Sequence, residues 1–286
     1  MDSMATGLYL VVFSIALMIL ISLGLAVIFG MMKVINLAHG EFMMVGGYIC
    51  VFTVNAGAPL WIGVITAGLG TAILGVIVER TVIQFLYGRM VDTLLATWGL
   101  SLLLVGLATT LFGASGMGLS TNYPTVSIGG MNVPGYNLVL CALAAVLVAL
   151  VWWLATYTKA GLLVRGTMQD AQVASCLGVD RARVYMATFG FGACLAGVAG
   201  AALAPLTGVS PTMGVFFVAK AFITVIVGGH LPLIGATTAS AIFGTIDGIV
   251  SYVQSAVMGE VSVLIAAVIL LRLLPLGLTG RMRRGM

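Results

Sequence analysis

Long apolar runs that contain no charged residue dominate the chain. They extend over 30 residues from Ser3 to Met32, 37 residues from Phe42 to Val78 and 66 residues from Thr93 to Thr158. A helix crosses the hydrocarbon core of a bilayer with about 20 apolar residues. The three runs therefore have room for one crossing, two crossings, and two or more crossings.

The apolar segments have the character of helices and not of barrel strands. A transmembrane β-strand alternates polar and apolar positions over about 10 residues, whereas the stretch from Leu8 to Ile21 is apolar on every face. Backbone groups in lipid must also be satisfied within the segment, as they are in a helix. We expect an all-α polytopic membrane protein, with a single transmembrane domain over residues 1–286.

About eight or nine transmembrane helices are predicted, some of them broken or re-entrant. The segment 216–229 is short and interrupted, so it fits either a crossing helix or a re-entrant half-helix. The expected spans are 8–29, a hairpin over 42–78 that turns at Gly57–Pro59, 93–112, 137–157, 184–204, two segments that flank 228–232, and 261–274.

Composition narrows the class of protein further. Hydrophobic residues make up 61% of the chain and charged residues 7%, against roughly 25% charged residues in soluble domains. This balance excludes a soluble enzyme, a nucleic-acid binder and a disordered protein. The cysteines have neither CxxC nor zinc spacing, so we expect packing residues and no cofactor or metal; they are Cys50, Cys141, Cys176 and Cys194.

The basic residues predict an orientation. Lys33, Arg80, Arg89, the loop 159–183 and the C-terminal arginines all fall on one side if the chain threads through the membrane at the expected spans. Basic residues accumulate on the cytoplasmic side. We therefore expect the N-terminus outside and the C-terminus in the cytoplasm, with Lys220 as the one basic residue away from that side.

A cluster of polar residues separates the first two apolar runs. The segment Lys33–Phe42 contains Asn36, His39, Gly40 and Glu41. One interpretation is a cytoplasmic loop whose polar groups are solvated. The other is a helix break beside a substrate route, because irregular backbone among membrane spans persists only where it faces protein or a water-filled cavity.

The segment 35–48, INLAHGEFMMVGGY, closely resembles a signature of the permease subunits of ABC importers for branched-chain amino acids and urea. The resemblance extends over nearly the whole chain. Residues 79–89 are similar to the family's acidic and basic segment after the third span, 94–102 to a second signature, and 208–229 to a third. Together these motifs are specific for the family.

The resemblance implies which side chains line or gate the route. These are Asn36, His39, Gly40, Glu41, Thr97, Trp98 and Ser101. The Thr97-Trp98-Gly99 version is most similar to urea and amide members, although branched-chain amino acid members dominate the family. Departures at Val105-Gly106, His230 and Leu274-Pro275 put the solute in doubt, not the family.

The loop at about 158–183 is the second candidate region. Its small residues recur at helical spacing, and residues 172–178 resemble the Glu-Ala-Ala-x-x-x-Gly motif of importer permeases. Two interpretations fit this loop. It is either a solvated connector or a short coupling helix whose small side chains allow it to fit into a groove of an ATPase. The candidate coupling residues are Arg165, Gln169, Asp170, Ala174 and Gly178.

Lys220 and Asp247 are charged residues within apolar segments. A charge near the middle of a bilayer costs about 3 kcal/mol on insertion scales and therefore usually faces protein or water. Asp247 fits either a structural contact with a neighbouring helix or a residue of the pathway.

The resemblance implies a permease subunit, not an enzyme, of an ATP-driven importer in a bacterial-type cytoplasmic (inner) membrane. Its implied solutes are branched-chain amino acids, or urea and short amides. The implied partners are a second homologous permease, two cytoplasmic ATPases and an extracytoplasmic solute-binding protein. An ion-gradient-driven transporter or channel fits the composition equally well. An intramembrane serine protease with Ser115 and His230 is a remote alternative, because Ser115 begins a polar loop.

Overall fold

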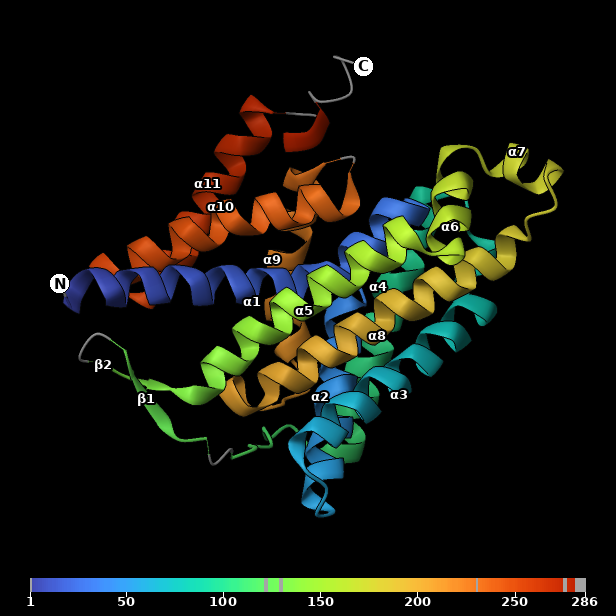
Figure 1. Ribbon diagram of the computed structural model, residues 1–286. Coiled ribbons are helices and arrows are strands. Elements are labelled where there is room, and N and C mark those ends of the chain that lie inside the picture. Colours follow the sequence, from blue (N-terminus) through green and yellow to red (C-terminus); the bar gives the residue numbers. More distant parts are fainter. Residues whose placement is uncertain (1, 121–122, 129–130, 230, 275–276, 281–286) are drawn as a thin grey trace. The chain divides into compact units, whose positions relative to one another are not determined.

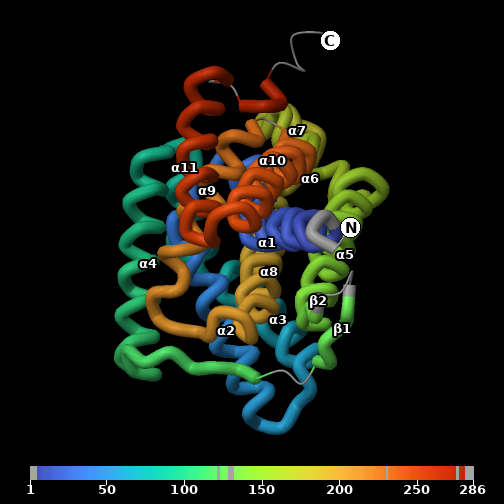
Figure 2. The backbone as a smooth tube through the Cα atoms, turned by 90° about the vertical axis from the view of Figure 1, so that its left-hand side faces the viewer, coloured from blue at the N-terminus to red at the C-terminus, as the bar shows by residue number. Residues whose placement is uncertain are grey.

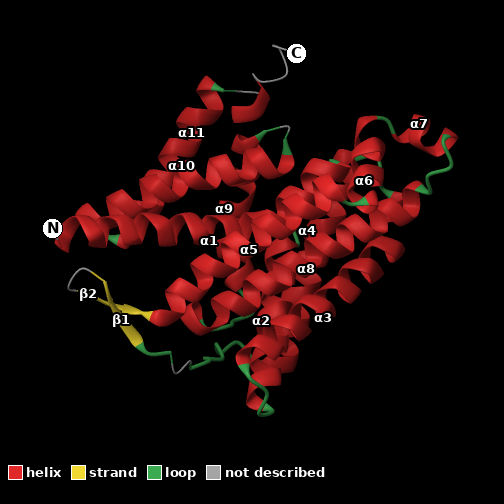
Figure 3. Cartoon of the chain, viewed as in Figure 1, coloured by secondary structure: helices red, strands yellow, loops and turns green. Residues whose placement is uncertain are grey.

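The protein is described by a computed structural model that covers residues 2–120, 123–128, 131–229, 231–274 and 277–280 (Figure 1). Helices make up most of it, and two short strands complete it (Figure 3). Among the described helices, seven are long and apolar enough to cross a membrane, namely α1, α3, α4, α5, α8, α10 and α11. The expected class, an all-α polytopic membrane protein, is confirmed.

The helices follow one another with short connections. In chain order they are α1 (Asp2–Met32), α2 (His39–Asn55), α3 (Leu60–Thr81), the 3-10 turn η1 (Ile83–Phe85), α4 (Met90–Phe112), α5 (Gly135–Tyr157), α6 (Lys159–Gln169), α7 (Ala171–Cys176), α8 (Arg181–Thr207), α9 (Met213–Gly228), α10 (Pro232–Val253) and α11 (Ala256–Leu273). The helices α2 and α9 are shorter, with 17 and 16 residues.

Some of the boundaries predicted from the sequence agree with the structure, and others differ. The turn expected at Gly57–Pro59 lies between the end of α2 and the start of α3. The segment expected to be interrupted at 216–229 is instead one continuous helix up to Gly228, α9. The helix α8 continues through Pro205 to Thr207, three residues beyond the expected end.

A small β-hairpin lies in the segment 113–136, where only a polar loop was expected. Strand β1 (Thr125–Ile128) pairs antiparallel with β2 (Met131–Pro134), with Thr125 opposite Pro134 and Ile128 opposite Met131. The strands are four residues long, shorter than a typical strand, so the alternation of side chains is brief. That brevity is the reason why the hairpin was missed.

The chain divides into two compact units that alternate along the sequence. Unit 1 comprises 1–22, 121–150 and 220–286, and unit 2 comprises 23–120 and 151–219. The helices α1, α5 and α9 each continue from one unit into the other. A single permease domain over the whole chain stays a prediction.

Backbone contacts at glycines hold the core of unit 2. Figures 1 and 2 show α2 and α3 alongside α8, which contacts both. A Cβ added to Gly200 of α8 would overlap the carbonyl oxygen of Met43 in α2, and one added to Gly197 would overlap Thr71 of α3. Small residues allow such close approach of helices in membranes, and here they place α8 against the other two helices.

The outward face of α3 is apolar. Trp61, Ile65, Leu69, Ile73 and Ile77 recur every four residues and are exposed, whereas the opposite face is buried against its own chain. Residues four apart lie on one side of a helix. An exposed stripe of this kind is suited to hydrocarbon, as expected for a membrane-spanning helix.

Helices of unit 1 pack closely as well. Gly244 and Gly248 of α10 lie against the backbone of Ile15 and Val11 in α1, at hypothetical Cβ distances of 2.5 Å. The hydroxyl groups of Ser22 and Ser240 lie 3.3 Å apart and share a hydrogen bond. These contacts join the first part of α1 to α10.

Candidate functional site

A break in the helical backbone separates α1 from α2. The helix α1 ends at Met32, and Lys33 has a φ of 54°, the one positive φ found among the described non-glycine residues. Left-handed backbone is uncommon outside glycine and costs of order 1–3 kcal/mol where it is sustained. The helix break expected in this segment is present.

Asn36 organises the turn that begins α2. Its Oδ1 accepts a hydrogen bond from the Ala38 amide at 3.1 Å, and its carbonyl oxygen accepts one from the His39 amide at 3.3 Å. An asparagine side chain that binds the backbone two residues later is a common turn device. Asn36 and His39 are fully buried and Glu41 is 1% exposed, which excludes the solvated loop.

Thr97 fixes this turn to α4. The Leu37 amide donates a hydrogen bond to Thr97 Oγ1 at 3.1 Å. That hydroxyl lies 3.2 Å from the Ile35 carbonyl oxygen and 3.1 Å from that of Leu94, and it shares its single hydrogen between them. Thr97 is thus the contact through which α4 holds the break.

Trp98 lies away from Thr97. Its side chain is 54% exposed, whereas Thr97 is fully buried. Consecutive residues of a helix point about 100° apart, so only Ser101, four residues after Thr97, shares its face. The structure therefore does not bring Trp98 to the other residues expected to line the route.

Glu41 and Ser101 form the next polar contact along the two helices. Glu41 lies in the first turn of α2, where a negative charge is favoured by the helix dipole. Its carboxylate accepts a hydrogen bond from the Ser101 hydroxyl. We call the five residues Asn36, Glu41, Tyr48, Thr97 and Ser101 the polar seam; all belong to unit 2.

Three buried atoms of the polar seam have no hydrogen-bond partner. They are Asn36 Nδ2, Glu41 Oε2 and the Tyr48 hydroxyl. Buried polar groups are almost always hydrogen-bonded, and leaving one unpaired costs about 1–3 kcal/mol. Tyr48 follows Glu41 by seven residues, or two helical turns, and so lies on the same face of α2. Sequence reasoning missed it.

Apolar residues enclose the seam. Met44, Leu104 and Ala108 are buried in the same core cluster as Tyr48. The rings of Tyr48 and Phe112 stack with centroids 4.5 Å apart. The seam is thus a short polar row within an aliphatic and aromatic surrounding.

His39 and Gly40 contribute to packing at the same break. A Cβ on Gly24 would lie 3.1 Å from His39 Cε1, so the imidazole lies against α1. Gly40 meets Gly214 of α9 backbone to backbone; a Cβ on Gly214 would lie 2.6 Å from the Gly40 carbonyl carbon. Gly40 permits this close approach, because a larger residue has no room.

A second buried carboxylate lies at the end of α3. Glu79 is 1% exposed and accepts a hydrogen bond from the Tyr87 hydroxyl, while its Oε2 has no partner. Burial, and then the hydrogen bond to Glu79, raise the pKa of Tyr87 above its ordinary value, so this hydroxyl stays a donor. The Tyr87 ring also packs against Tyr185 of α8, with centroids 4.7 Å apart.

The segment 158–183 folds as two helices, α6 and α7, between capped ends. Asp170 Oδ1 accepts hydrogen bonds from the amides of Gln172 and Val173, at 2.8 and 3.0 Å, and so begins α7. Aspartate is among the preferred residues at this position. A short helix within this segment was expected and is present.

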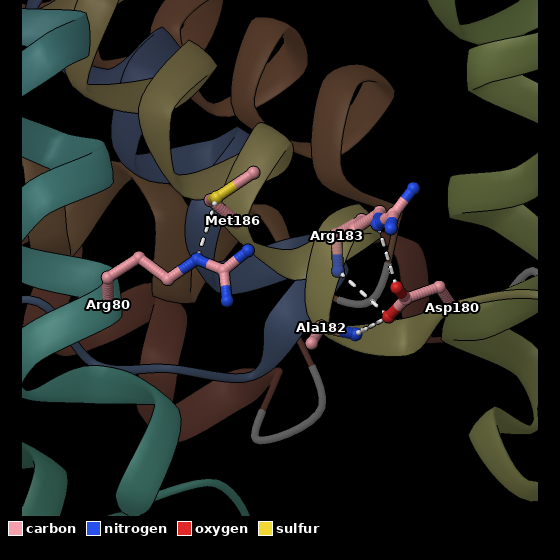
Figure 4. A network of polar contacts seen from close by, with 5 residues as sticks. All are labelled: Arg80, Asp180, Ala182, Arg183 and Met186. Atoms are coloured by element: carbon pink, nitrogen blue, oxygen red, sulfur yellow. Dashed lines mark hydrogen bonds and ion pairs between the residues drawn. The ribbon is translucent and has the colours of Figure 1, made fainter.

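Asp180 begins α8 in the same way (Figure 4). Its Oδ1 accepts from the amides of Ala182 and Arg183, and its Oδ2 lies 2.9 Å from Arg183 Nε. Nearby, Arg80 of α3 extends to Met186 of α8, with Nε 3.0 Å from Sδ. The first turn of α8 is therefore tied both to the segment before it and to α3.

The outward surface of α7 differs from the expected small face. Ala174 is 6% exposed and faces its own chain, whereas Val173 and Leu177 are exposed, Leu177 by 79%. Gly178 has a φ of 86°, a conformation that glycine adopts without strain, and it ends the helix. Arg165, Gln169 and Asp170 are exposed. A partner at this segment would meet apolar side chains at least as much as small ones.

The charges within apolar segments have neighbours in unit 1. Lys220 of α9 pairs with Glu260 of α11. Asp247 of α10 packs against α11, since a Cβ on Gly259 would lie 2.7 Å from Asp247 Oδ1. Ser115 is exposed in the loop after α4, as its sequence context indicated, and His230 lies outside the described residues.

Comparison with known proteins places the chain in a family. Residues 7–274 match the model described as branched-chain amino acid transport system, permease component. The high-affinity branched-chain amino acid transport permease LivH of Salmonella typhimurium is 27% identical, over 92% of this chain and 91% of its own. BraD of Pseudomonas aeruginosa, named likewise, is 25% identical over the same shares.

The likeness extends to an archaeon. A protein of Methanocaldococcus jannaschii named as a probable branched-chain amino acid transport permease, LivH, is 23% identical, over 92% of this chain and 89% of its own. No solved structure matches the chain. Because the family model covers almost its whole length, this chain belongs to the family of branched-chain amino acid transport system permease components.

Proposed function

We propose that this permease moves branched-chain amino acids into the cytoplasm. The observation that carries the proposal is the match of residues 7–274 to a family described by that transport, together with the names of its relatives. Urea and short amides are the second candidate solutes. The motif that suggested them includes Trp98, whose side chain is exposed and points away from that of Thr97.

The chain is a multi-pass permease subunit of an ABC importer in the cytoplasmic (inner) membrane, and ATP is hydrolysed on separate ATPase subunits. ABC importers of this family work with ATPase and solute-binding partners. For this chain we propose a second homologous permease, two cytoplasmic ATPases and one extracytoplasmic binding protein. The basic residues support an orientation with the N-terminus outside and the segment 158–183 in the cytoplasm.

The segment 158–183 is the proposed contact with an ATPase. Its exposed apolar residues Val173 and Leu177, on a short helix fixed by Asp170, suit a helix-in-groove contact. Asp180 joins this segment directly to α8, the central helix of unit 2. ATP-driven closure of the ATPases would thereby move α8 and open the route to one side of the membrane at a time.

The polar seam is the proposed part of the route. It combines Asn36, in the break between α1 and α2, with buried polar side chains of α2 and α4. Irregular backbone beside membrane spans is typical of transporter substrate sites. Of the residues expected in the route, Asn36, Glu41, Thr97 and Ser101 belong to the seam. Trp98 is exposed, and His39 and Gly40 pack against α1 and α9.

The test is uptake by the reconstituted importer. The permease is co-expressed with its genomic neighbours, and the purified complex is placed in liposomes with ATP inside and the binding protein outside. We expect ATP-dependent uptake of labelled leucine, isoleucine and valine, and less uptake of labelled urea. Uptake of urea without leucine would select the second candidate solutes. Uptake that follows an ion gradient without any ATPase would overturn the assignment of an ATP-driven importer.

A further inference from the structure

We propose that the polar seam binds the charged head group of an α-amino acid, with the Glu41 carboxylate facing the ammonium group and Asn36 Nδ2 donating to the carboxylate. This inference rests on the proposed function and adds a residue-level solute site in the permease itself. The binding protein is then not the only component that selects the solute.

The unpaired atoms have the required chemistry. Asn36 Nδ2 is a donor, and Glu41 Oε2 is an acceptor that bears charge when ionised. A zwitterion presents the complement of both, an ammonium that donates and a carboxylate that accepts. Buried charges are normally paired and buried polar groups hydrogen-bonded, so such a solute would satisfy both atoms at once.

The other atoms of these residues are already engaged. Asn36 Oδ1 is held by the Ala38 amide, and the Glu41 carboxylate accepts from Ser101. Ser101 and Thr97 lie one helical turn apart on α4, so a single helix positions both residues of the proposed pair. The free atoms are therefore held in place by neighbours, as preorganised binding groups are.

The surrounding residues suit an aliphatic side chain. Met44, Leu104 and Ala108 are buried beside Tyr48, two helical turns along α2 from Glu41. Two turns correspond to about 10 Å, enough for the side chain of leucine to extend from a head group at Glu41 toward these residues. The Tyr48 hydroxyl, also unpaired, lies at the far end of that path.

The seam is closed in this structure, because Asn36, Glu41 and Tyr48 are at most 3% exposed. A solute would enter when α2 and α4 separate, as alternating access requires. In the closed form each unpaired atom destabilises the fold, because a buried polar group without a partner loses its hydrogen bonds to water. Such a cost is typical of atoms that gain their partners in another state of a functional site.

The test measures solute binding and its selectivity. The complete importer, without binding protein, is placed in lipid nanodiscs, and binding of labelled leucine is followed by scintillation proximity with three unlabelled competitors. These are leucine, 4-methylpentanoate, which lacks the ammonium group, and 3-methylbutylamine, which lacks the carboxylate. We expect each analogue to compete about tenfold more weakly than leucine or worse, as loss of a hydrogen bond to a charged group predicts.

Two variants assign the head-group contacts. Glu41→Gln keeps the shape of the side chain and the Ser101 contact but removes the charge. It should weaken leucine binding about tenfold and reduce the difference in affinity between leucine and 4-methylpentanoate. Asn36→Asp keeps the acceptor for the Ala38 amide and replaces the donor with a second acceptor. This variant should weaken leucine binding and reduce the difference in affinity between leucine and 3-methylbutylamine.

Glu79→Gln is the matched control. Glu79 is equally buried, also accepts a hydrogen bond from a hydroxyl and also has an unpaired Oε2, but it lies at the end of α3. It should leave the selectivity among the competitors unchanged. The same reduction in Glu79→Gln, or unchanged selectivity in both seam variants, would overturn the proposed site.

Uptake separates this inference from the proposed function. If liposomes take up leucine but the wild-type complex binds none without the binding protein, the seam holds only water and the proposed site is wrong, while the transport function stands. If liposomes take up no branched-chain amino acid at all, the proposed solute class and the site both fail.

Discussion

Lys220 of α9 and Glu260 of α11 form an ion pair across 40 residues of sequence, with Nζ 2.7 Å from Oε1. Of the twelve basic residues, Lys220 is the one that the predicted orientation leaves away from the cytoplasmic side. Its pairing with Glu260 explains how it is accommodated in an apolar helix, since charges in membrane segments usually pair with one another.

Removing one member of this pair should destabilise the protein more than removing both. Lys220→Met leaves Glu260 without its counter-charge, and we expect a loss of about 1–3 kcal/mol. The double variant Lys220→Met/Glu260→Gln should recover most of that loss. Thermal unfolding of the wild type, Lys220→Met, Glu260→Gln and the double variant in detergent gives the coupling free energy. If the losses of the two single variants add up to the loss of the double variant, the pair contributes nothing to stability.

The glycines of α8 are expected to tolerate no side chain. Gly200→Ala places a methyl group on the Met43 carbonyl oxygen, and overpacking of this kind costs about 1–3 kcal/mol. Gly99→Ala in α4 is the matched control, because nothing lies within 4 Å of its added Cβ and alanine favours helix by about 1 kcal/mol. Melting temperatures in detergent should fall for Gly200→Ala and stay level or rise for Gly99→Ala. A similar fall for both would contradict the close contact.

Thr97 should act through its hydroxyl group. Thr97→Val conserves volume but leaves the Leu37 amide without its partner, and we expect a loss of about 1–3 kcal/mol in stability and slower uptake. Thr97→Ser retains the hydroxyl and should retain most of both. Hydrogen exchange at the Leu37 amide should rise in the valine variant alone. Equal exchange in the two variants would show that α4 does not hold the helix break.

Leu177 is predicted to bind the ATPase. Leu177→Asp should leave the permease folded, since the side chain is 79% exposed, and should reduce co-purification of the ATPase and ATP-dependent uptake. Leu177→Met keeps an apolar side chain and serves as the control. Ala174→Trp is expected to lower thermal stability as well, because Ala174 faces its own chain. Full co-purification with Leu177→Asp would place the ATPase contact elsewhere.

Much of the fold follows from the length of the apolar runs. The turn of the α2–α3 hairpin lies at Gly57–Pro59 as expected, because turn residues between two apolar runs locate a helix boundary well. The polar residues of the seam were also visible, since Asn36 and Glu41 interrupt an apolar pattern. Tyr48 was not, because its neighbours are apolar and its unpaired hydroxyl is a tertiary property.

Other features required three-dimensional information. The sequence distance between Lys220 and Glu260 hides their pairing. The exposure of Trp98 and the burial of Ala174 depend on which face of each helix meets the rest of the chain. Local pattern indicates where a helix is amphipathic, but α4 is apolar on nearly every face and therefore gives no such indication.

The backbone contacts of α8 in unit 2 bear on how the transporter moves. Where Gly200 meets Met43, and Gly197 meets Gly46, no side-chain torsion lies between the two main chains. Helices separated by flexible side chains slide past one another by changing rotamers, but main chains in direct contact have no such freedom. We therefore expect a displacement imposed at Asp180 to reach α2 through α8 with little loss.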